Sequence, residues 1–299
     1  MKPKKSLKDL NLLDRFLFAE EMEDPDNLRI LLEIILGREI VLKYEPQVEM
    51  ERRNSPMYRF IRLDVFARDM ERTVYDTEVQ KRNTRNLPKR SRFYQGVVDG
   101  KLLEPGEIDF NKLNDVYIIT IAPFDIFGMD KYIYTFRMTC EEVPGLRLED
   151  GAVRIFLNTH GKNPDEVSPE LVELLNYIEN SNEQTANGCK SQRIHELQKR
   201  IEAIKSSEEV SVKYMQEWEE RELEKNDARD EGRREGLQEG RQEGLQEGHR
   251  EGREEGIRAL IFDNLEEQKT REQIIGKLMR RFSLTEKEAG DYYEKTVPH

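Results

Sequence analysis

The sequence predicts a mixed α/β domain over residues 1–182, followed by a long helical extension. Two observations support this fold class. Apolar residues recur at helical spacing in residues 8–22 and 27–36, whereas residues 60–67 and 74–80 alternate with the period of two that strands show. Helices that lead into a hairpin, with a further helix and more strands behind it, are typical of a mixed α/β or α+β domain.

The two leading helices have recognisable ends. Pro25 ends the helix predicted at residues 8–22, and Asp26 is a suitable N-terminal cap for the helix predicted at residues 27–36. Gly37 stands where the residue after a helix often adopts a left-handed conformation. The sequence therefore predicts a helical pair ahead of the first strand.

A β-hairpin is predicted next. Residues 60–67 and 74–80 flank the short polar segment RDMERT, which suits a turn. Side chains two residues apart on a strand point to the same face. The polar faces of the two strands are therefore expected to carry Arg62, Asp64 and Phe66 on the first and Val74, Asp76, Glu78 and Gln80 on the second.

The rest of the domain mixes helix and strand. Pro88 is placed to open a third helix that runs to about Leu102. A short helix at residues 168–180 closes the domain, and the polar residues that follow predict a linker over 183–207. Further strands are expected between these two helices, at residues 116–122, 132–138 and 153–158.

Beyond residue 207 the chain is highly charged. Residues 208–256 form an acidic segment with glycine at every fourth position from 232 to 256, and residues 257–299 resemble a small set of amphipathic helices. Seven interior glycines cost a helix roughly 7 kcal/mol relative to alanine. Two interpretations remain open: a helix that packs closely against a second copy along its glycine stripe, giving a homo-oligomer, or a partly disordered low-complexity segment.

Composition limits what the chain can be. Hydrophobic residues make up 36% and charged residues 37%, which is too polar for one core built from all 299 residues. No apolar run approaches the ~20 residues of a membrane span, and no such run follows the basic N-terminus as in a secretory signal. Cys140 and Cys189 lack metal-ligand spacing and are expected to be reduced thiols. These features predict a cytoplasmic protein with no membrane partner.

The predicted hairpin can hold the groups that phosphodiester hydrolysis needs: carboxylates that bind a divalent metal and a polar group that orients water. If the turn centres near Glu71, Asp64 lies across from Glu78, with Cβ atoms ~5 Å apart. Gln80 then points to the same side as Glu78. Facing carboxylates repel unless a cation lies between them, and Mg²⁺ (or Mn²⁺) suits so sparse a ligand set. Spacing alone also allows Asp64 and Glu78 to be ordinary residues of an exposed hairpin face.

The run RLDVFARDMERTVYDTEVQKR resembles the PD-(D/E)XK nuclease signature, with Asp64 as its aspartate and Glu78-x-Gln80 at its E-x-K. The chain also has Asp14 with Phe16, the RLDV and EVQ strands, RFYQ at 92–95 and IAPFDIFG at 121–128. By these features it is more narrowly similar to the Rpn family of recombination-promoting nucleases. The similarity covers residues 8–180 well and the glycine-rich tail loosely. It implies a restriction-endonuclease-like core and a Mg²⁺-dependent DNA endonuclease that promotes recombination or transposition.

Two site assignments have alternatives. Gln80 stands where most nucleases of the superfamily have lysine, and an amide orients water but brings no positive charge to the transition state. The alternative function is therefore a catalytically inactive nuclease-fold protein that acts as a DNA-binding or oligomeric assembly module. Asp14 is a candidate for a further acidic metal ligand beside Asp64 and Glu78; a capping or surface role on the first helix is its alternative.

A basic run predicts the DNA-binding surface. Residues 81–95 contain six Lys or Arg and no acid, although the net charge of the chain is −12. Such side chains neutralise phosphates without reading base sequence. A solvated helix face is the alternative, but the absence of any acid favours phosphate contact. The candidate DNA-binding residues are Lys81, Arg82, Arg85, Lys89, Arg90 and Arg92.

Overall fold

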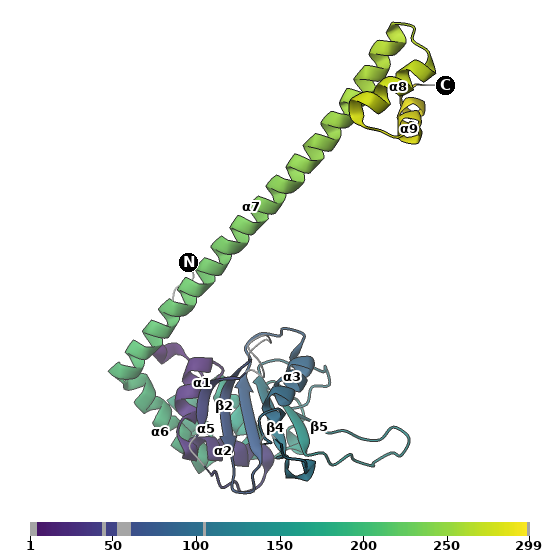
Figure 1. Cartoon of the computed structure of the whole chain (residues 1–299). Helices are drawn as coiled ribbons and strands as arrows, with labels where there is room; N and C mark the ends of the chain where they lie inside the picture. The colour runs from purple at the N-terminus through teal and green to yellow at the C-terminus, as the bar shows by residue number, and fades with distance from the viewer. Residues whose placement is uncertain (1–4, 44–45, 53–60, 104–105, 298–299) are drawn as a thin grey trace. The chain divides into compact units, whose positions relative to one another are not determined.

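A computed structural model describes residues 5–43, 46–52, 61–103 and 106–297 (Figure 1). The chain divides into two compact units, Met1–Gln216 and Glu217–His299. Within the described residues, the first unit is built on a six-stranded mixed sheet with helices against both faces. The mixed α/β fold class predicted from the sequence is therefore confirmed.

The sheet has the strand order β1-β2-β3-β4-β6-β5. The first three strands pair antiparallel, β3, β4 and β6 are parallel, and β5 returns antiparallel at the far edge. Five of these strands were expected from the sequence; β1 was not. The strands are β1 (Gln47–Arg52), β2 (Ile61–Arg68), β3 (Val74–Val79), β4 (Val116–Ala122), β5 (Ile133–Phe136) and β6 (Ala152–Asn158).

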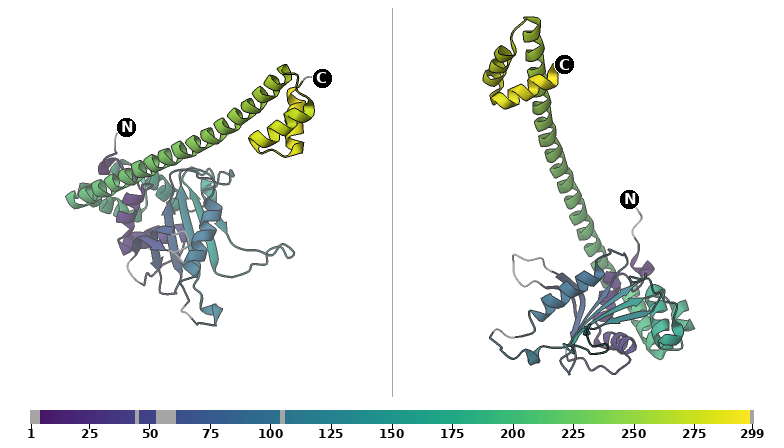
Figure 2. Two further views of the ribbon diagram at one scale, coloured as in Figure 1. Left: turned by 45° about the horizontal axis from the view of Figure 1, so that its top comes forward. Right: turned by 90° about the vertical axis from the view of Figure 1, so that its right-hand side faces the viewer.

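The two faces of the sheet are covered unequally, as the views in Figure 2 show. A single helix, α3 (Leu87–Asp99), packs on one face through Val97 and Val98. The opposite face carries the larger core, and among the described residues five helices supply its buried helical side chains. These are α1 (Arg15–Met22), α2 (Pro25–Leu36), α4 (Pro169–Glu179), α5 (Glu183–Gly188) and α6 (Gln192–Ser206). Short 3₁₀ turns lie at Leu7–Asp9, Phe110–Lys112 and Pro164–Glu166.

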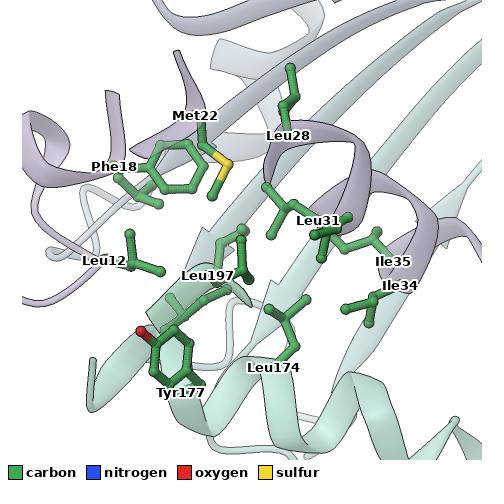
Figure 3. Packing of buried hydrophobic residues seen from close by; sticks show 14 of the residues in the cluster. Leu12, Phe18, Met22, Leu28, Leu31, Ile34, Ile35, Leu174, Tyr177 and Leu197 are labelled. Atoms are coloured by element: carbon green, nitrogen blue, oxygen red, sulfur yellow. The ribbon is translucent and has the colours of Figure 1, made fainter. Parts of the chain in front are cut away.

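The larger core joins helices from both ends of the unit. Figure 3 shows Met22 and Leu31 from the leading helices near Leu174 and Leu197 from the later ones. These side chains are fully buried, and burial of one such side chain stabilises the fold by about 1.5–3 kcal/mol. The helices after the last strand therefore belong to the same core as the helices before the first.

Three boundaries differ from the sequence predictions. Helix α1 begins at Arg15 rather than near residue 8, because Asp14 caps it by accepting a hydrogen bond from the Phe16 amide. Asp24, not Asp26, caps α2, since Pro25 fits the first turn of a helix. Residues 183–207 are not a linker: they form α5 and α6, which pack into the core through residues such as Ile194 and Leu197.

The second unit is helical. Helix α7 runs from Glu208 to Glu266, so its first turns belong to the first unit. Helices α8 (Arg271–Phe282) and α9 (Glu286–Thr296) pack on its C-terminal end around Ile261, Ile274 and Leu278. The C-terminal helical segment expected at 257–299 therefore has a core of its own.

Two further features bear on the sequence expectations. No helix in the described ranges has the length and apolar character needed to cross a membrane. Cys140 and Cys189 are both free thiols.

Candidate active site

The β2–β3 hairpin brings Asp64 and Glu78 face to face. The strands pair antiparallel with Val65 opposite Thr77, and the next position of the same register sets Asp64 opposite Glu78. Both side chains point toward the face that α3 covers, and both are buried. This is the register that the sequence predicts for a turn centred near Glu71.

The turn between the strands is held by specific contacts, which is why the register is defined. Asp69 accepts a hydrogen bond from the Thr73 amide at 2.8 Å and another from the Tyr75 hydroxyl at 2.7 Å. Arg72 adopts a left-handed conformation with φ of 71°. A slip by one residue would move every side chain of the hairpin to the opposite face.

Each of the two facing carboxylates is paired with an arginine. Arg15, the first residue of α1, forms an ion pair with Asp64, which also accepts a hydrogen bond from the Val79 amide at 3.3 Å. Arg90 of α3 donates to Oε2 of Glu78 at 2.8 Å. Elements on both faces of the sheet thus deliver cations to the same pair of acids.

A third carboxylate lies beside them. Asp76 precedes Glu78 by two residues on β3, so both side chains point to the same face. Asp76 is 0% exposed, and neither carboxylate oxygen has a hydrogen-bond partner among the described residues. Buried polar atoms without partners are uncommon and costly, so this position needs a functional or electrostatic explanation.

Burial makes all three carboxylates harder to ionise. It raises the pKa of Glu78 to about 7, and the nearby charge of Asp64 adds to the effect. The pKa of Asp76 is raised well above its usual value by burial and then by Glu78 and Asp64. Burial also raises the pKa of Asp64, against the opposing effect of Arg15. The charged forms of these acids are therefore disfavoured in the site, and Arg15 and Arg90 offset that effect only in part.

Gln80 lies at the open end of this row of acids. Its Oε1 accepts a hydrogen bond from Arg90 at 3.0 Å, and its Nε2 donates to the Arg82 carbonyl at 2.7 Å. The same Arg90 nitrogen therefore contacts both Glu78 and Gln80. Gln80 thus lies beside Glu78, and the catalytic roles predicted for Asp64, Glu78 and Gln80 stay predictions.

Asp14 occupies the neighbouring end of α1. It caps that helix and pairs with Lys81, whose Nζ lies 2.9 Å from Oδ2 of Asp14. The capping role that the sequence allowed is thus present. The assignment of Asp14 as a metal ligand stays a prediction.

The six basic residues separate into two groups. Arg90 is half-buried and turned toward Glu78, on the inner side of α3. The others are exposed at the surface, on the loop after β3 and the outer side of α3. The exposed residues are Lys81, Arg82, Arg85, Lys89 and Arg92.

The chemistry of the donor set fits a hard divalent cation. Carboxylate oxygens are the ligands that Mg²⁺ prefers, and it is commonly held by one or two of them together with water. Among the described residues no group of three His, Cys, Asp or Glu side chains has the arrangement of a metal site. Asp64 and Glu78 stay the predicted pair of ligands, and the unpartnered oxygens of Asp76 lie on the same face of β3 as Glu78.

Sequence reasoning missed two members of this site. From the sequence, Asp76 was placed on the correct face but was given no role. The available signal was the alternation of Asp76, Glu78 and Gln80 along a strand that a helix covers. Arg15 carried no signal of its own, because its contact with Asp64 joins segments that are far apart in the sequence.

Residues 13–231 match a protein-family model described as PD-(D/E)XK nuclease family transposase. That match covers well over half of the chain. No curated protein and no solved structure matches the chain.

Proposed function

Because the chain belongs to the PD-(D/E)XK nuclease family transposases, we propose that its first unit is a DNA endonuclease that uses Mg²⁺ or Mn²⁺ to hydrolyse phosphodiester bonds. Membership of the family gives a nuclease- or transposase-related function, and nucleases of this kind generally use divalent metals. A role in promoting DNA recombination or transposition is part of the proposal.

One observation carries the proposal: Asp64 and Glu78 are buried opposite each other although each is an acid. Two such groups are expected to repel, and a fold that needed only stability would have apolar residues there. Asp64 and Glu78 would hold the metal ion. A divalent metal bound at such a site stabilises negative charge on phosphate oxygens and lowers the pKa of water.

The remaining residues have defined tasks in the proposed hydrolysis. Gln80 orients the attacking water, since its Oε1 lies at the open end of the row of acids. The water oxygen forms a bond to phosphorus as the bond from phosphorus to one sugar oxygen breaks. One water proton ends on the departing sugar oxygen and the other stays with the new phosphate monoester.

The proposed DNA path follows the loop after β3 and the outer side of α3. Lys81, Arg82 and Arg85 on the loop, with Lys89 and Arg92 on the helix, are exposed. They flank the acids from one side, so a duplex backbone held by them would pass the site. Contacts of this kind are independent of base sequence.

The test is cleavage of a supercoiled plasmid and a linear duplex by the full-length protein with Mg²⁺, Mn²⁺ or EDTA. Cleavage with either metal, lost in EDTA and in Asp64→Asn and Glu78→Gln, is the expected result. These variants keep side-chain size while removing a charged ligand. Glu39→Gln, on an exposed residue of the same unit, is the matched control and should cut at the wild-type rate. Cutting in EDTA, or full activity in both site variants, would refute the metal assignment.

The neutral Gln80 favours a second candidate function, in which the fold binds DNA or assembles without cutting it. Such a protein would bind DNA with no product formed under any metal. Self-association through α7 and a cytoplasmic location are further proposals. Exposed Leu237 and Leu245 in the glycine-rich part of α7 support the first of these.

A further inference from the structure

Arg90 differs from every other member of the basic run in what it contacts. Its Nη2 lies 2.8 Å from Oε2 of Glu78 and 3.0 Å from Oε1 of Gln80. The guanidinium carbon also lies 5.5 Å from the centre of the Tyr94 ring, over its face. Only 26% of the Arg90 side chain is exposed. The cation is thus fixed at the acids rather than displayed at the surface.

Phosphodiester hydrolysis needs positive charge at this place. As water adds to phosphorus, negative charge is distributed over the oxygens of the reacting phosphate, and preorganised cations stabilise it. Gln80, which follows Glu78 by two residues and lies just past the end of β3, is neutral. Nothing on β3 can therefore meet this requirement.

We propose that Arg90 is a catalytic residue of the nuclease site, which supplies from α3 the positive charge that Gln80 does not bring to the reacting phosphate. This inference rests on the proposed function. A guanidinium presents several donors in one plane, so Arg90 can keep one nitrogen toward Gln80 while others contact the phosphate oxygens. In the protein without DNA, Glu78 takes the place of the phosphate as its anionic partner.

The position of Arg90 favours this role over two simpler ones. An exposed DNA contact would point outward with Lys89 and Arg92, whereas Arg90 points inward. A purely structural ion pair would not need a second contact to the amide that orients water. The Tyr94 ring, which stacks on the guanidinium, limits its movement and so preorganises it.

The experiment moves the charge between the two elements. Arg90→Gln removes it, Arg90→Lys keeps it with poorer geometry, and the double variant Arg90→Gln/Gln80→Lys returns it from β3. Lys101→Gln, a charge removal just beyond the end of α3, is the control. Three quantities are measured on the full-length protein: the single-turnover rate at saturating DNA with Mg²⁺, the DNA Kd with Ca²⁺, and the Mn²⁺ affinity without DNA.

The single-turnover rate of Arg90→Gln is expected to fall about 10²-fold or more. This is the loss that other enzymes show when one hydrogen-bond donor to the transition state is removed. Its DNA Kd should change by less than about tenfold, the effect of one phosphate contact. The double variant should recover at least part of the missing rate, and Arg90→Lys should lie between wild type and Arg90→Gln. Mn²⁺ should bind Arg90→Gln more tightly, because a cation that competes for Glu78 is gone.

The outcomes separate this inference from the proposed function. A wild type that cuts DNA while Arg90→Gln cuts at the same rate overturns the inference alone. So does an Arg90→Gln defect confined to the DNA Kd, which would make Arg90 a binding residue. Unchanged Mn²⁺ affinity in Arg90→Gln contradicts the contact with Glu78. A wild type that never cuts DNA overturns the proposed function itself.

Discussion

Asp64 and Glu78 lie opposite each other on adjacent strands, and both are buried. Each has one guanidinium partner, Arg15 for Asp64 and Arg90 for Glu78, drawn from helices on opposite faces of the sheet. The two arginines offset part of the negative charge of the acids but do not remove the repulsion between them, since burial and Asp64 still raise the pKa of Glu78 to about 7. The pair therefore lowers the stability of the fold, and the proposed function assigns it the binding of a cation.

The first prediction concerns this effect on stability. Burial and the charge of Asp64 raise the pKa of Glu78 from 4.5 to about 7, so the folded state retains its proton more strongly. Stability from this group is present below pH 4.5 and is lost as pH rises through about 7. Without metal, Glu78→Gln should therefore raise the free energy of unfolding at pH 8 by on the order of 2–3 kcal/mol, with the gain shrinking toward pH 4.5.

Urea unfolding of the metal-free protein at pH 5 and pH 8 measures this effect. Glu39→Gln, on an exposed side chain, is the control and should leave both values unchanged. Added Mn²⁺ should stabilise the wild type, because an ion that binds the folded state shifts the folding equilibrium toward it. Glu78→Gln lacks one of the proposed ligands and should not be stabilised. Equal stabilisation of both proteins by Mn²⁺ would place the ion elsewhere.

A second prediction concerns the DNA path. Lys89→Glu and Arg92→Glu reverse two exposed charges on the outer side of α3. DNA affinity should fall for all sequences alike, and the slope of log K against log salt should flatten by about one unit for each phosphate that the protein no longer neutralises. Fluorescence anisotropy over a salt series with Ca²⁺ present gives the slope. Lys101→Glu serves as the control, and an unchanged slope in the first two variants would move the path to another surface.

The hairpin was the part of the site most open to prediction. Strand alternation fixes which residues share a face, and a short polar turn leaves few registers, so Asp64 could be set opposite Glu78 from spacing alone. Arg90 was identified as basic, but its inward direction depends on where α3 packs over β3. Such a contact between elements has no periodic signature in the sequence.

The errors at the helices have a similar origin. Residues 183–207 have a polar average that suggested a linker, yet Ile194, Leu197 and Ile201 share one face of α6 and are fully buried. Average polarity hides such a stripe, because the exposed side of the helix dominates the count. Strand β1 was missed because it lies at the edge of the sheet, where a single neighbour permits charged residues.

A third prediction concerns a buried acid outside the site. Glu21 of α1 is 0% exposed, and both of its carboxylate oxygens lack a hydrogen-bond partner among the described residues. Burial raises its pKa from 4.5 to about 9, against the opposing effect of Arg200. The folded protein therefore holds this proton at neutral pH, and the stability that depends on it is lost as pH rises from 4.5 through about 9.

Glu21→Gln should remove that part of the pH dependence. The expected gain in the free energy of unfolding at pH 9 is on the order of a few kcal/mol relative to pH 5, since one pKa unit corresponds to about 1.4 kcal/mol. Thermal or urea unfolding across pH 5–9 measures it, with Glu183→Gln on an exposed helix end as the control. A parallel pH profile in Glu21→Gln and wild type would mean that Glu21 is ionised when folded.

The last prediction concerns the glycines of α7. The helix is continuous from Glu208 to Glu266, yet glycines inside it cost about 1 kcal/mol each relative to alanine. Its ion pairs, such as Arg250–Glu247 at 3.6 Å, are worth only ~0.2–0.5 kcal/mol each. Apart from the adjacent residues and the nearby backbone of α7 itself, nothing in the described part of the chain lies within 4 Å of a methyl group built at the six glycines from Gly232 to Gly252. We therefore expect a second copy of the chain to pack along this stripe.

Replacing these six glycines with alanine in the fragment 217–299 should raise its helicity and yet weaken its self-association, because methyl groups prevent close approach of two helices. Sedimentation and circular dichroism on one sample measure both quantities. Alanine at Gln238, Gln242 and Gln246, in the same repeat but off the glycine positions, should leave association intact. An unstructured monomer of the wild-type fragment would favour the low-complexity interpretation. A fully helical monomer would instead show that the helix tolerates its glycines without a partner, contradicting the energetic argument.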